Sequence, residues 1–232
     1  MEFREVMQKL KSLSSPKNVE GMARFGINSE SALGVSTPDL RKLAKEIGRN
    51  HKMAQKLWSS GIHEARILAS MVDEPEKTTE KQMDKWIKDF DSWDVCDQCC
   101  MNLFWQVPFI YKKAKEWCSR KEEFERRAGF AMIAVLAMKD KKAEDKKFEQ
   151  FFPLIKKYST DERNFVRKAV NWALRQIGKR NKNLNRKAIR VAREIQKIDS
   201  SVKWIATDAL RELTSDAIQK RLKKYDNFCN YL

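Results

Sequence analysis

A chain of 232 residues with 42% hydrophobic content can bury one sizeable core, and its 7 glycines and 5 prolines are few for the many turns of an all-β protein. Its 48 lysines and arginines against 32 aspartates and glutamates give a net charge of +16, which favours a polyanionic partner such as nucleic acid. No apolar run approaches the ~20 residues that span a bilayer, and the amphipathic N-terminus lacks the apolar core of a signal peptide, so we expect a cytoplasmic protein.

Capping residues predict helices early in the chain. Thr37 followed by Pro38 marks a helix start, and Gly48 marks its end after an apolar-periodic stretch. Thr79 and Gln82 form a second N-terminal signature, of the capping-box type. Val, Ile and Thr are scattered rather than bunched, and no segment shows the alternation of a strand. The sequence therefore predicts an all-α fold.

Weak self-similarity in the second half of the chain predicts how these helices are arranged. The stretch that begins at Arg127 is echoed 41 positions later at Lys168, and the Ala-Leu-Arg at 173–175 returns 36 positions further on, at 209–211. Periods of this size are typical of HEAT- or armadillo-like helix pairs. We therefore predict one domain over residues 1–232, a monomeric curved solenoid of HEAT-like antiparallel helix pairs with a concave basic groove. Coincidence among alanine-rich helices is the alternative.

The cysteines do not predict a metal site. Cys96, Cys99 and Cys100 cluster, and the first two form a CxxC, but Cys118 and Cys229 lie apart from them, as do the two histidines. A structural zinc site needs a second ligand pair at workable spacing. We expect reduced thiols packed on a helix, with no metal and no cofactor.

The first candidate for chemistry is Asp97. If Ser92 caps a helix, Trp93 and Asp97 lie four residues apart on one face, while Cys96 and Cys100 face the core. A carboxylate one turn from a large aromatic ring is a possible catalytic pair. The alternative is an exposed aspartate that the helix dipole stabilises near the N-terminus.

A tryptophan among cations is the second candidate. The helix expected over 164–179 places its apolar positions on one face. The opposite stripe carries Asn164, Lys168, Trp172, Arg175 and Lys179. Core packing does not explain a tryptophan in that stripe, whereas a surface that meets phosphates and a flat sugar or base does. A tryptophan that covers the next repeat, or a cation–π pair with Arg175, is the alternative.

Basic loops extend this surface. Lys179, Arg180 and Lys182 follow the helix, and a similar basic loop over 139–147 lies one repeat earlier. Loops at equivalent positions of successive repeats would line positive charge along one side of the solenoid, which suits a phosphate backbone. The residues that we expect to bind DNA are Lys168, Arg175, Lys179, Arg180 and Lys182. The alternative is that the loop charges are only solvated.

A pair of arginines, Arg126 and Arg127, opens the helix expected over 128–138. Because apolar residues follow at once, we expect one arginine to point into the groove and the other to be solvated. A guanidinium fork binds phosphate or carboxylate through two hydrogen bonds, so the partner is either DNA or Asp97. The common phosphate-loop, serine-hydrolase and zinc-protease motifs do not occur, and with two histidines any chemistry has to use carboxylate, arginine and aromatic groups.

Together these motifs resemble the AlkD-like DNA alkylation repair glycosylases, a family with HEAT-like repeats. The resemblance runs from Gly21 to Leu213 and is carried by Leu33-Gly-Val-Ser-Thr-Pro38, Trp93-Asp-Val-Cys-Asp97, Arg126-Arg127-Ala128 and Val170-Asn-Trp172-Ala-Leu-Arg175. It implies that the family's catalytic aspartate is Asp97 and its active-site arginine is Arg127. Its cleft tryptophans would be Trp93 and Trp172, and Arg175 matches a residue near the DNA backbone.

The resemblance implies chemistry directed at the sugar. Alkylation at N3 or N7 makes a purine cationic, so the base leaves as a neutral group and needs no strong general acid. Asp97 would stabilise an oxocarbenium-like sugar and position the attacking water. Trp93 and Trp172 would flank the deoxyribose, and Arg127 would hold a phosphate and keep Asp97 ionised. The implied function is a monofunctional DNA glycosylase of base excision repair, which acts on double-stranded DNA with alkylated bases.

Two other functions fit the same charge pattern. One is a non-catalytic HEAT-like protein that binds bent or branched DNA, and the other is a helical-repeat scaffold for an acidic protein partner. A carboxylate inside a cationic groove repels phosphate and weakens DNA binding. The presence of Asp97 therefore favours catalysis over either alternative.

Overall fold

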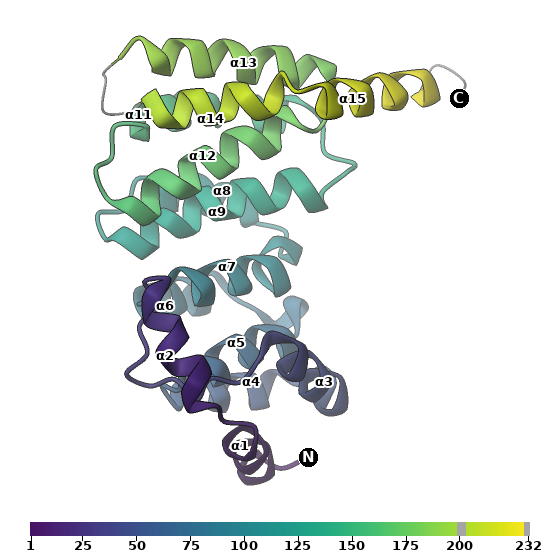
Figure 1. The fold of residues 1–232 in the computed structure, drawn as a ribbon. Coiled ribbons are helices and arrows are strands. Elements are labelled where there is room, and N and C mark those ends of the chain that lie inside the picture. Colours follow the sequence, from purple (N-terminus) through teal and green to yellow (C-terminus); the bar gives the residue numbers. More distant parts are fainter. Residues whose placement is uncertain (199–202, 230–232) are drawn as a thin grey trace. The chain divides into compact units, whose positions relative to one another are not determined.

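The computed structural model describes residues 1–198 and 203–229, with side chains as far as residue 223, and every regular element in these ranges is a helix (Figure 1). The all-α prediction is therefore confirmed for the described residues. The chain forms two compact units, unit 1 (Met1–Ile110) and unit 2 (Tyr111–Leu232). In the described part, no helix combines the length and the apolar character that a bilayer crossing requires.

Unit 1 is built from short helices. They are α1 (Phe3–Ser12), α2 (Pro16–Arg24), α3 (Thr37–Ile47), α4 (His51–Ser59), α5 (His63–Val72), the 3-10 turn η1 (Pro75–Lys77), α6 (Glu80–Lys88), α7 (Trp93–Asn102) and the 3-10 turn η2 (Phe104–Gln106). Helix α5 contacts α3, α4 and α7, so it lies at the centre of the unit.

The predicted caps decide where helices of unit 1 begin. Helix α6 starts as predicted, because Thr79 Oγ1 accepts a hydrogen bond from the backbone N of Gln82 at 3.1 Å. Helix α3 starts at Thr37 with Pro38 in its first turn, but the capping side chain is that of Ser36, one residue earlier than predicted, whose Oγ accepts a hydrogen bond from the backbone N of Asp39 at 3.3 Å. Gly48 ends α3 with a φ of 71°, a backbone conformation that favours glycine.

Aromatic rings fill the centre of unit 1. Trp58 of α4 and Trp86 of α6 stack with ring centroids 3.9 Å apart and an interplanar angle of 2°. Phe90 packs edge-on against Trp58, and Phe104 lies tilted against Trp86. These large buried side chains account for much of the apolar surface that the unit removes from water.

Unit 2 combines several long helices with two short ones. They are α8 (Ile110–Cys118, which begins at the last residue of unit 1), α9 (Glu123–Lys139), α10 (Lys146–Glu149), α11 (Phe152–Tyr158), α12 (Asn164–Gly178), α13 (Lys182–Gln196), α14 (Lys203–Leu213) and α15 (Asp216–Cys229). Helix α12 packs against α9 on one side and against α13 and α14 on the other (Figure 1).

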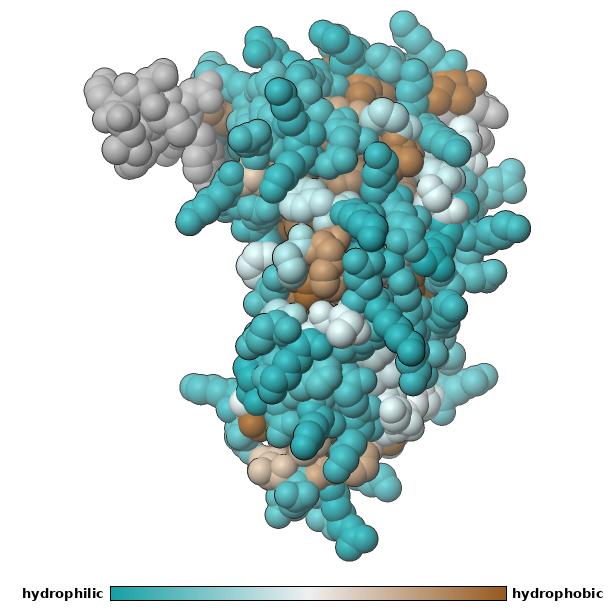
Figure 2. All heavy atoms as spheres, turned by 180° about the vertical axis from the view of Figure 1, so that it is seen from behind, coloured by the Kyte–Doolittle hydropathy of each residue, from teal (hydrophilic) through white to brown (hydrophobic). Residues whose placement is uncertain are grey.

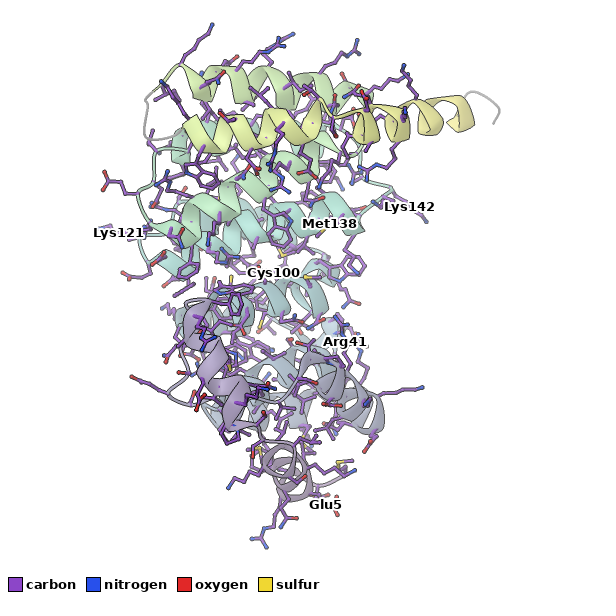
Figure 3. The ribbon with its side chains drawn as sticks, in the orientation of Figure 1. Glu5, Arg41, Cys100, Lys121, Met138 and Lys142 are labelled. Carbon is purple, nitrogen blue, oxygen red and sulfur yellow. The ribbon has the colours of Figure 1, made fainter. Side chains whose placement is uncertain are left out.

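Small residues allow the helices of unit 2 to approach closely. Helix α9 is buried from Arg127 to Ala137. A Cβ atom at Gly129 would lie 2.4 Å from the backbone N of Cys118, so only glycine lets α9 pass this close to the end of α8. The basic loop after α9 is exposed, and Lys142 extends away from the helices there (Figure 3).

Candidate functional site

Helix α7 carries the predicted catalytic pair. Its fully buried residues are Val95, Cys96, Cys99 and Cys100, the last of which is labelled in Figure 3. Trp93 and Asp97 are one turn apart on α7, and both are only half-buried. The aromatic ring and the carboxylate therefore share the part of α7 that the core leaves uncovered.

The start of α7 is tied to the loop between α2 and α3. Trp93 Nε1 donates a hydrogen bond to the carbonyl oxygen of Phe25 at 3.0 Å. The Ser92 hydroxyl accepts from the backbone N of Asn28 at 2.8 Å, and Asn28 Nδ2 donates to Asp91 at 3.2 Å. Ser92 occupies the N-cap position, but its side chain does not cap the helix, contrary to the sequence-based expectation. Its hydroxyl oxygen binds the distant loop instead.

The buried side chain of His63 binds Asp94, the carboxylate in the first turn of α7. His63 Nε2 of α5 lies 2.8 Å from Asp94 Oδ2, and only 3% of His63 is exposed. Burial lowers the pKa of His63, but the hydrogen bond and charge of Asp94, with the charges of Glu64 and Asp91, raise it overall. The pKa of His63 therefore lies above its ordinary value. Asp94 is consequently engaged in holding α5 to α7.

In unit 2, α12 has the amphipathic pattern expected from the sequence, with two differences. Val166, Ala169, Val170, Ala173, Leu174 and Ile177 are buried as expected. Phe165 is only half-buried, whereas Asn171 is buried among the apolar residues. Asn171 Nδ2 donates to Asp208 Oδ2 of α14 at 2.7 Å, which explains a polar residue at that position.

Two of the predicted DNA-binding residues are joined by carboxylates from α14. Arg175 Nη1 donates to Asp208 Oδ2 at 2.9 Å, and Arg175 Nε also binds Glu212. Lys179 Nζ donates to the other oxygen of Glu212 at 2.6 Å. Burial raises the pKa of Glu212, but hydrogen bonds from Lys179 and Arg175 lower it overall. The sequence analysis did not identify these two carboxylates.

The side chain of Gln176 in α12 connects Trp172 with Lys179, the residue that follows the helix. With the Gln176 amide turned so that its oxygen faces these donors, Trp172 Nε1 and Lys179 Nζ each lie 3.1 Å from that oxygen. The Trp172 ring is half-buried. Trp172 is thus held in a fixed orientation next to the Arg175–Lys179 cluster.

Neither arginine at the start of α9 is solvated, which corrects the sequence-based expectation. Arg127 is 5% exposed, and its Nη1 donates to the carbonyl oxygen of Phe165 at 2.7 Å. Arg126 pairs with Asp161 at 2.6 Å, and its guanidinium lies 4.5 Å from the centroid of the Tyr158 ring. Arg126 therefore connects α9 to the segment that precedes α12, and Arg127 connects α9 to the first turn of α12.

Two basic residues that follow α12, Arg180 and Lys182, differ in their surroundings. Arg180 donates to the carbonyl oxygens of Ala137 and Ala143 at 2.9 and 3.0 Å, and its guanidinium lies 4.0 Å from the centroid of Phe148. Arg180 therefore fastens the loop after α9, and a DNA contact of Arg180 stays a prediction. Lys182 is exposed at the start of α13.

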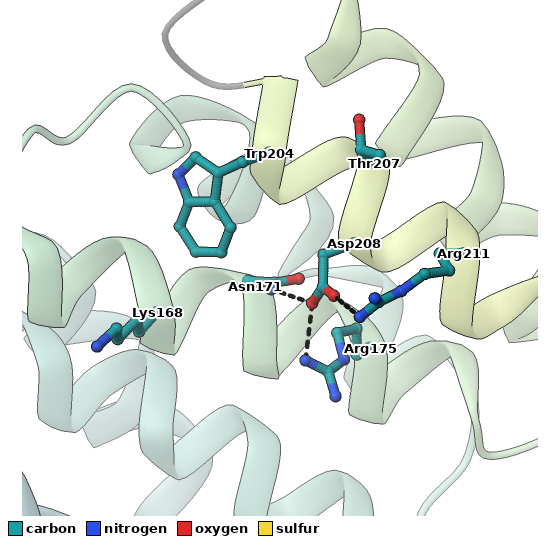
Figure 4. A pocket seen from close by; sticks show the side chains of 7 residues that line it. All are labelled: Lys168, Asn171, Arg175, Trp204, Thr207, Asp208 and Arg211. Atoms are coloured by element: carbon teal, nitrogen blue, oxygen red, sulfur yellow. Dashed lines mark hydrogen bonds and ion pairs between the residues drawn. The ribbon is translucent and has the colours of Figure 1, made fainter.

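A groove between α12 and α14 gathers residues of which the sequence analysis named only Lys168 and Arg175. Its volume is about 480 Å³, and it is lined by Lys168, Asn171, Arg175, Trp204, Thr207, Asp208 and Arg211 (Figure 4). The spacing of Trp204 and Asp208 could have identified this groove, because the two residues lie four positions apart, as Trp93 and Asp97 do.

The predicted catalytic residues belong to different units. Trp93 and Asp97 lie in unit 1, whereas Arg127 and Trp172 lie in unit 2. Because the four side chains come from both units, a common site of all four stays a prediction. No three His, Cys, Asp or Glu side chains gather as a metal site in the ranges that the structure describes.

Comparisons with known proteins extend these observations. The family model described as "DNA alkylation repair enzyme" matches residues 6–228. A solved structure from "a new family of proteins related to the HEAT-like repeat DNA glycosylases with affinity for branched DNA structures" has a TM-score of 0.77 and 22% sequence identity, over 91% of this chain and 95% of that chain. A designed armadillo repeat protein in complex with a (KR)4 peptide has a TM-score of 0.36 and 14% identity, over 95% of this chain and 87% of that chain. No curated protein matches the sequence. The first structural similarity confirms the predicted HEAT-like fold.

Proposed function

Because the chain belongs to the DNA alkylation repair enzyme family, we propose that it is a DNA glycosylase that hydrolyses the N-glycosidic bond of cationic N3- or N7-alkylated purines in double-stranded DNA. The observation that carries this proposal is the pair on α7. Asp97 lies one turn after Trp93, and both are left half-exposed while the neighbouring cysteines are buried. A carboxylate beside an aromatic ring suits the stabilisation of a cationic sugar.

Two other carboxylates, Asp94 in the first turn of α7 and Asp91 just before the helix, hold α7 in place. Asp94 is held by His63, and Asp91 accepts a hydrogen bond from Asn28 and lies 3.6 Å from Arg66. These two carboxylates hold α7 to α5 and to the loop after α2.

In the proposed reaction, the alkylated base leaves without protonation because its positive charge already makes it a good leaving group. Asp97 stabilises the developing positive charge on the deoxyribose and orients the water that attacks C1′. Trp93 and Trp172 flank the sugar and exclude bulk water. Arg127, the predicted active-site arginine, lies in unit 2, so its part in this reaction stays a prediction. The two units then act on one DNA duplex as a single functional domain.

The net charge of +16 supports DNA as the partner. Lys168 and Lys182 are exposed and suited to phosphate contacts. Arg175 and Lys179 have to exchange their carboxylate partners for phosphate. Hydrophilic side chains cover most of the face shown in Figure 2. DNA binding through phosphate contacts is therefore expected to depend strongly on salt.

The test is base release from methylated duplex DNA by the wild type and by Asp97→Asn. We expect wild type to release 3-methyladenine or 7-methylguanine, and Asp97→Asn to lose release by ~100-fold or more while it binds DNA at least as tightly. Asp94→Asn is the matched control, because it removes the same charge from the same helix and keeps an oxygen for His63. Release by Asp97→Asn at the rate of the control would refute the catalytic role.

A second candidate function is the binding of branched or bent DNA without catalysis. It is supported by the description of the similar structure, whose family has affinity for branched DNA structures. In that case wild type would release no base and would bind a four-way junction more tightly than a linear duplex of the same length. The same assay therefore separates the two candidates.

A further inference from the structure

The groove between α12 and α14 lies wholly within unit 2 and contains an exposed aromatic ring. Trp204, in the first turn of α14, is 39% exposed, although most tryptophans of the described chain are buried or half-buried. The Arg167 guanidinium lies 5.4 Å from the centroid of its ring, a cation–π contact that fixes the orientation of the indole. An oriented ring that stays exposed to water is a platform on which a flat ligand can stack.

Cations line the same groove. Lys168 is exposed on α12, across the groove from Trp204 (Figure 4). Arg211 reaches the groove from α14 with 78% of its side chain exposed. Asp208 accepts hydrogen bonds from Asn171, Arg175 and Arg211, so its charge is compensated within the groove. The charge that remains is positive, which selects an anionic ligand.

One buried group in the wall of the groove is not satisfied by the protein. Asn171 is 4% exposed, and its amide donates to Asp208. Its Oδ1 atom has no hydrogen-bond partner within the described part of the chain. A buried acceptor without a partner is costly, and a ligand that donates an N–H at this wall would offset that cost.

We propose that this groove binds one unstacked nucleotide of a DNA strand, with the base against Trp204 and the phosphates of the strand at Lys168 and Arg211, on the two ends of the groove (Figure 4). A base inside a duplex has both faces covered by its neighbours, so only an unpaired or extruded nucleotide can lie on the indole. The inference deepens the proposed function in that it takes DNA as the ligand. It uses residues of unit 2 alone and does not involve Asp97.

The test compares two short single-stranded probes, oligothymidylate and an abasic backbone of the same length and charge. By fluorescence anisotropy, Trp204→Leu is expected to bind oligothymidylate about ten-fold more weakly than wild type and the abasic probe equally well. Trp204→Phe, which keeps an aromatic ring, is expected to restore most of the affinity. Equal losses for both probes, or no loss for either, would overturn the stacking role.

The phosphate contact is tested with Lys168→Ala and Arg211→Ala. Each is expected to weaken both probes and to reduce the slope of log affinity against log salt by about 0.7. Arg190→Ala, which removes an exposed cation from α13, is the control and should change the slope less. Slopes for Lys168→Ala and Arg211→Ala that match the control would show that the phosphate lies elsewhere.

Base release from methylated duplex by the wild type is measured in parallel. If wild type releases base but Trp204→Leu binds both probes like wild type, the nucleotide site is wrong and the glycosylase proposal stands. If Trp204→Leu selectively loses oligothymidylate but wild type releases no base, the nucleotide site stands and the glycosylase proposal fails.

Discussion

Arg175 Nη1 of α12 lies 2.9 Å from Asp208 Oδ2 of α14, and the same guanidinium also binds Glu212. An arginine expected to hold DNA phosphate therefore holds two carboxylates of its own chain. Because a carboxylate and a phosphate use the same face of a guanidinium, DNA has to compete with α14 for this side chain. The ion pairs are partly exposed, so the exchange is possible without unfolding either helix.

Removal of these carboxylates should strengthen DNA binding. For Asp208→Asn combined with Glu212→Gln, we expect affinity for undamaged duplex to rise roughly five-fold at low salt, with a steeper salt dependence because two cations are released. The measurement is a salt titration of duplex binding. Glu162→Gln with Asp216→Asn, which removes two exposed carboxylates of unit 2, is the control. A double variant no different from this control would show that Arg175 and Lys179 do not meet DNA.

Arg180 should matter for stability. Its guanidinium binds two backbone carbonyls and the face of Phe148, so Arg180→Ala is expected to lower the free energy of unfolding by about 2 kcal/mol. Urea denaturation measures the change. The exposed neighbour gives the comparison, because Lys182→Ala should cost less than about 0.5 kcal/mol. Similar small effects for both variants would show that the contacts of Arg180 do not stabilise the fold.

The His63–Asp94 pair predicts a pH dependence of stability. Because the pKa of His63 is raised in the folded state above 6.5, its stabilising contribution is complete below pH 6.5 and is lost as the pH rises through the folded pKa. The free energy of unfolding should therefore fall as the pH rises above 6.5. Asp94→Asn removes the charge that raises this pKa most and should flatten that part of the profile. A wild-type profile that rises with pH in this range would contradict the assignment.

The buried cysteines should be inert. Cys96, Cys99, Cys100 and Cys118 are fully buried, and burial raises the pKa of Cys99 and Cys118, so little nucleophilic thiolate forms. In a Cys229→Ser variant, we expect thiol reagents at pH 8 to react only after denaturation. Chelators should leave base release and melting temperature unchanged. Stoichiometric zinc, with activity lost when it is removed, would contradict this prediction.

Lesion size should matter little if the chemistry is directed at the sugar. We expect a methyl and a much bulkier N7 adduct to be released at similar single-turnover rates, while uracil is not released. Trp172→Leu should slow the release of both cationic lesions by a similar factor, because in the proposed reaction Trp172 contacts a sugar common to both. Rejection of the bulky adduct by wild type would indicate an enclosed base pocket instead.

Local sequence predicted the helices well because the interactions that start and stop them span only a few residues. The hydrogen bond from Gln82 to Thr79 and the positive φ of Gly48 need no knowledge of the rest of the chain. The same holds for the spacing that places Trp93 and Asp97 one turn apart on α7. The repeat period predicted the HEAT-like pairing, since neighbouring repeats bury equivalent apolar faces.

The tertiary structure decided which polar side chains bind other groups of the same protein. Ser92 was expected to cap its own helix, but its hydroxyl binds Asn28, 64 residues away. Arg180 was read as a DNA contact, but Phe148 and two carbonyls from other elements hold it. Arg175 was placed correctly on the polar stripe of α12, yet its partner Asp208 comes from α14. A helix period fixes the direction in which such a side chain points, whereas the group that it meets depends on the packing of helices distant in sequence.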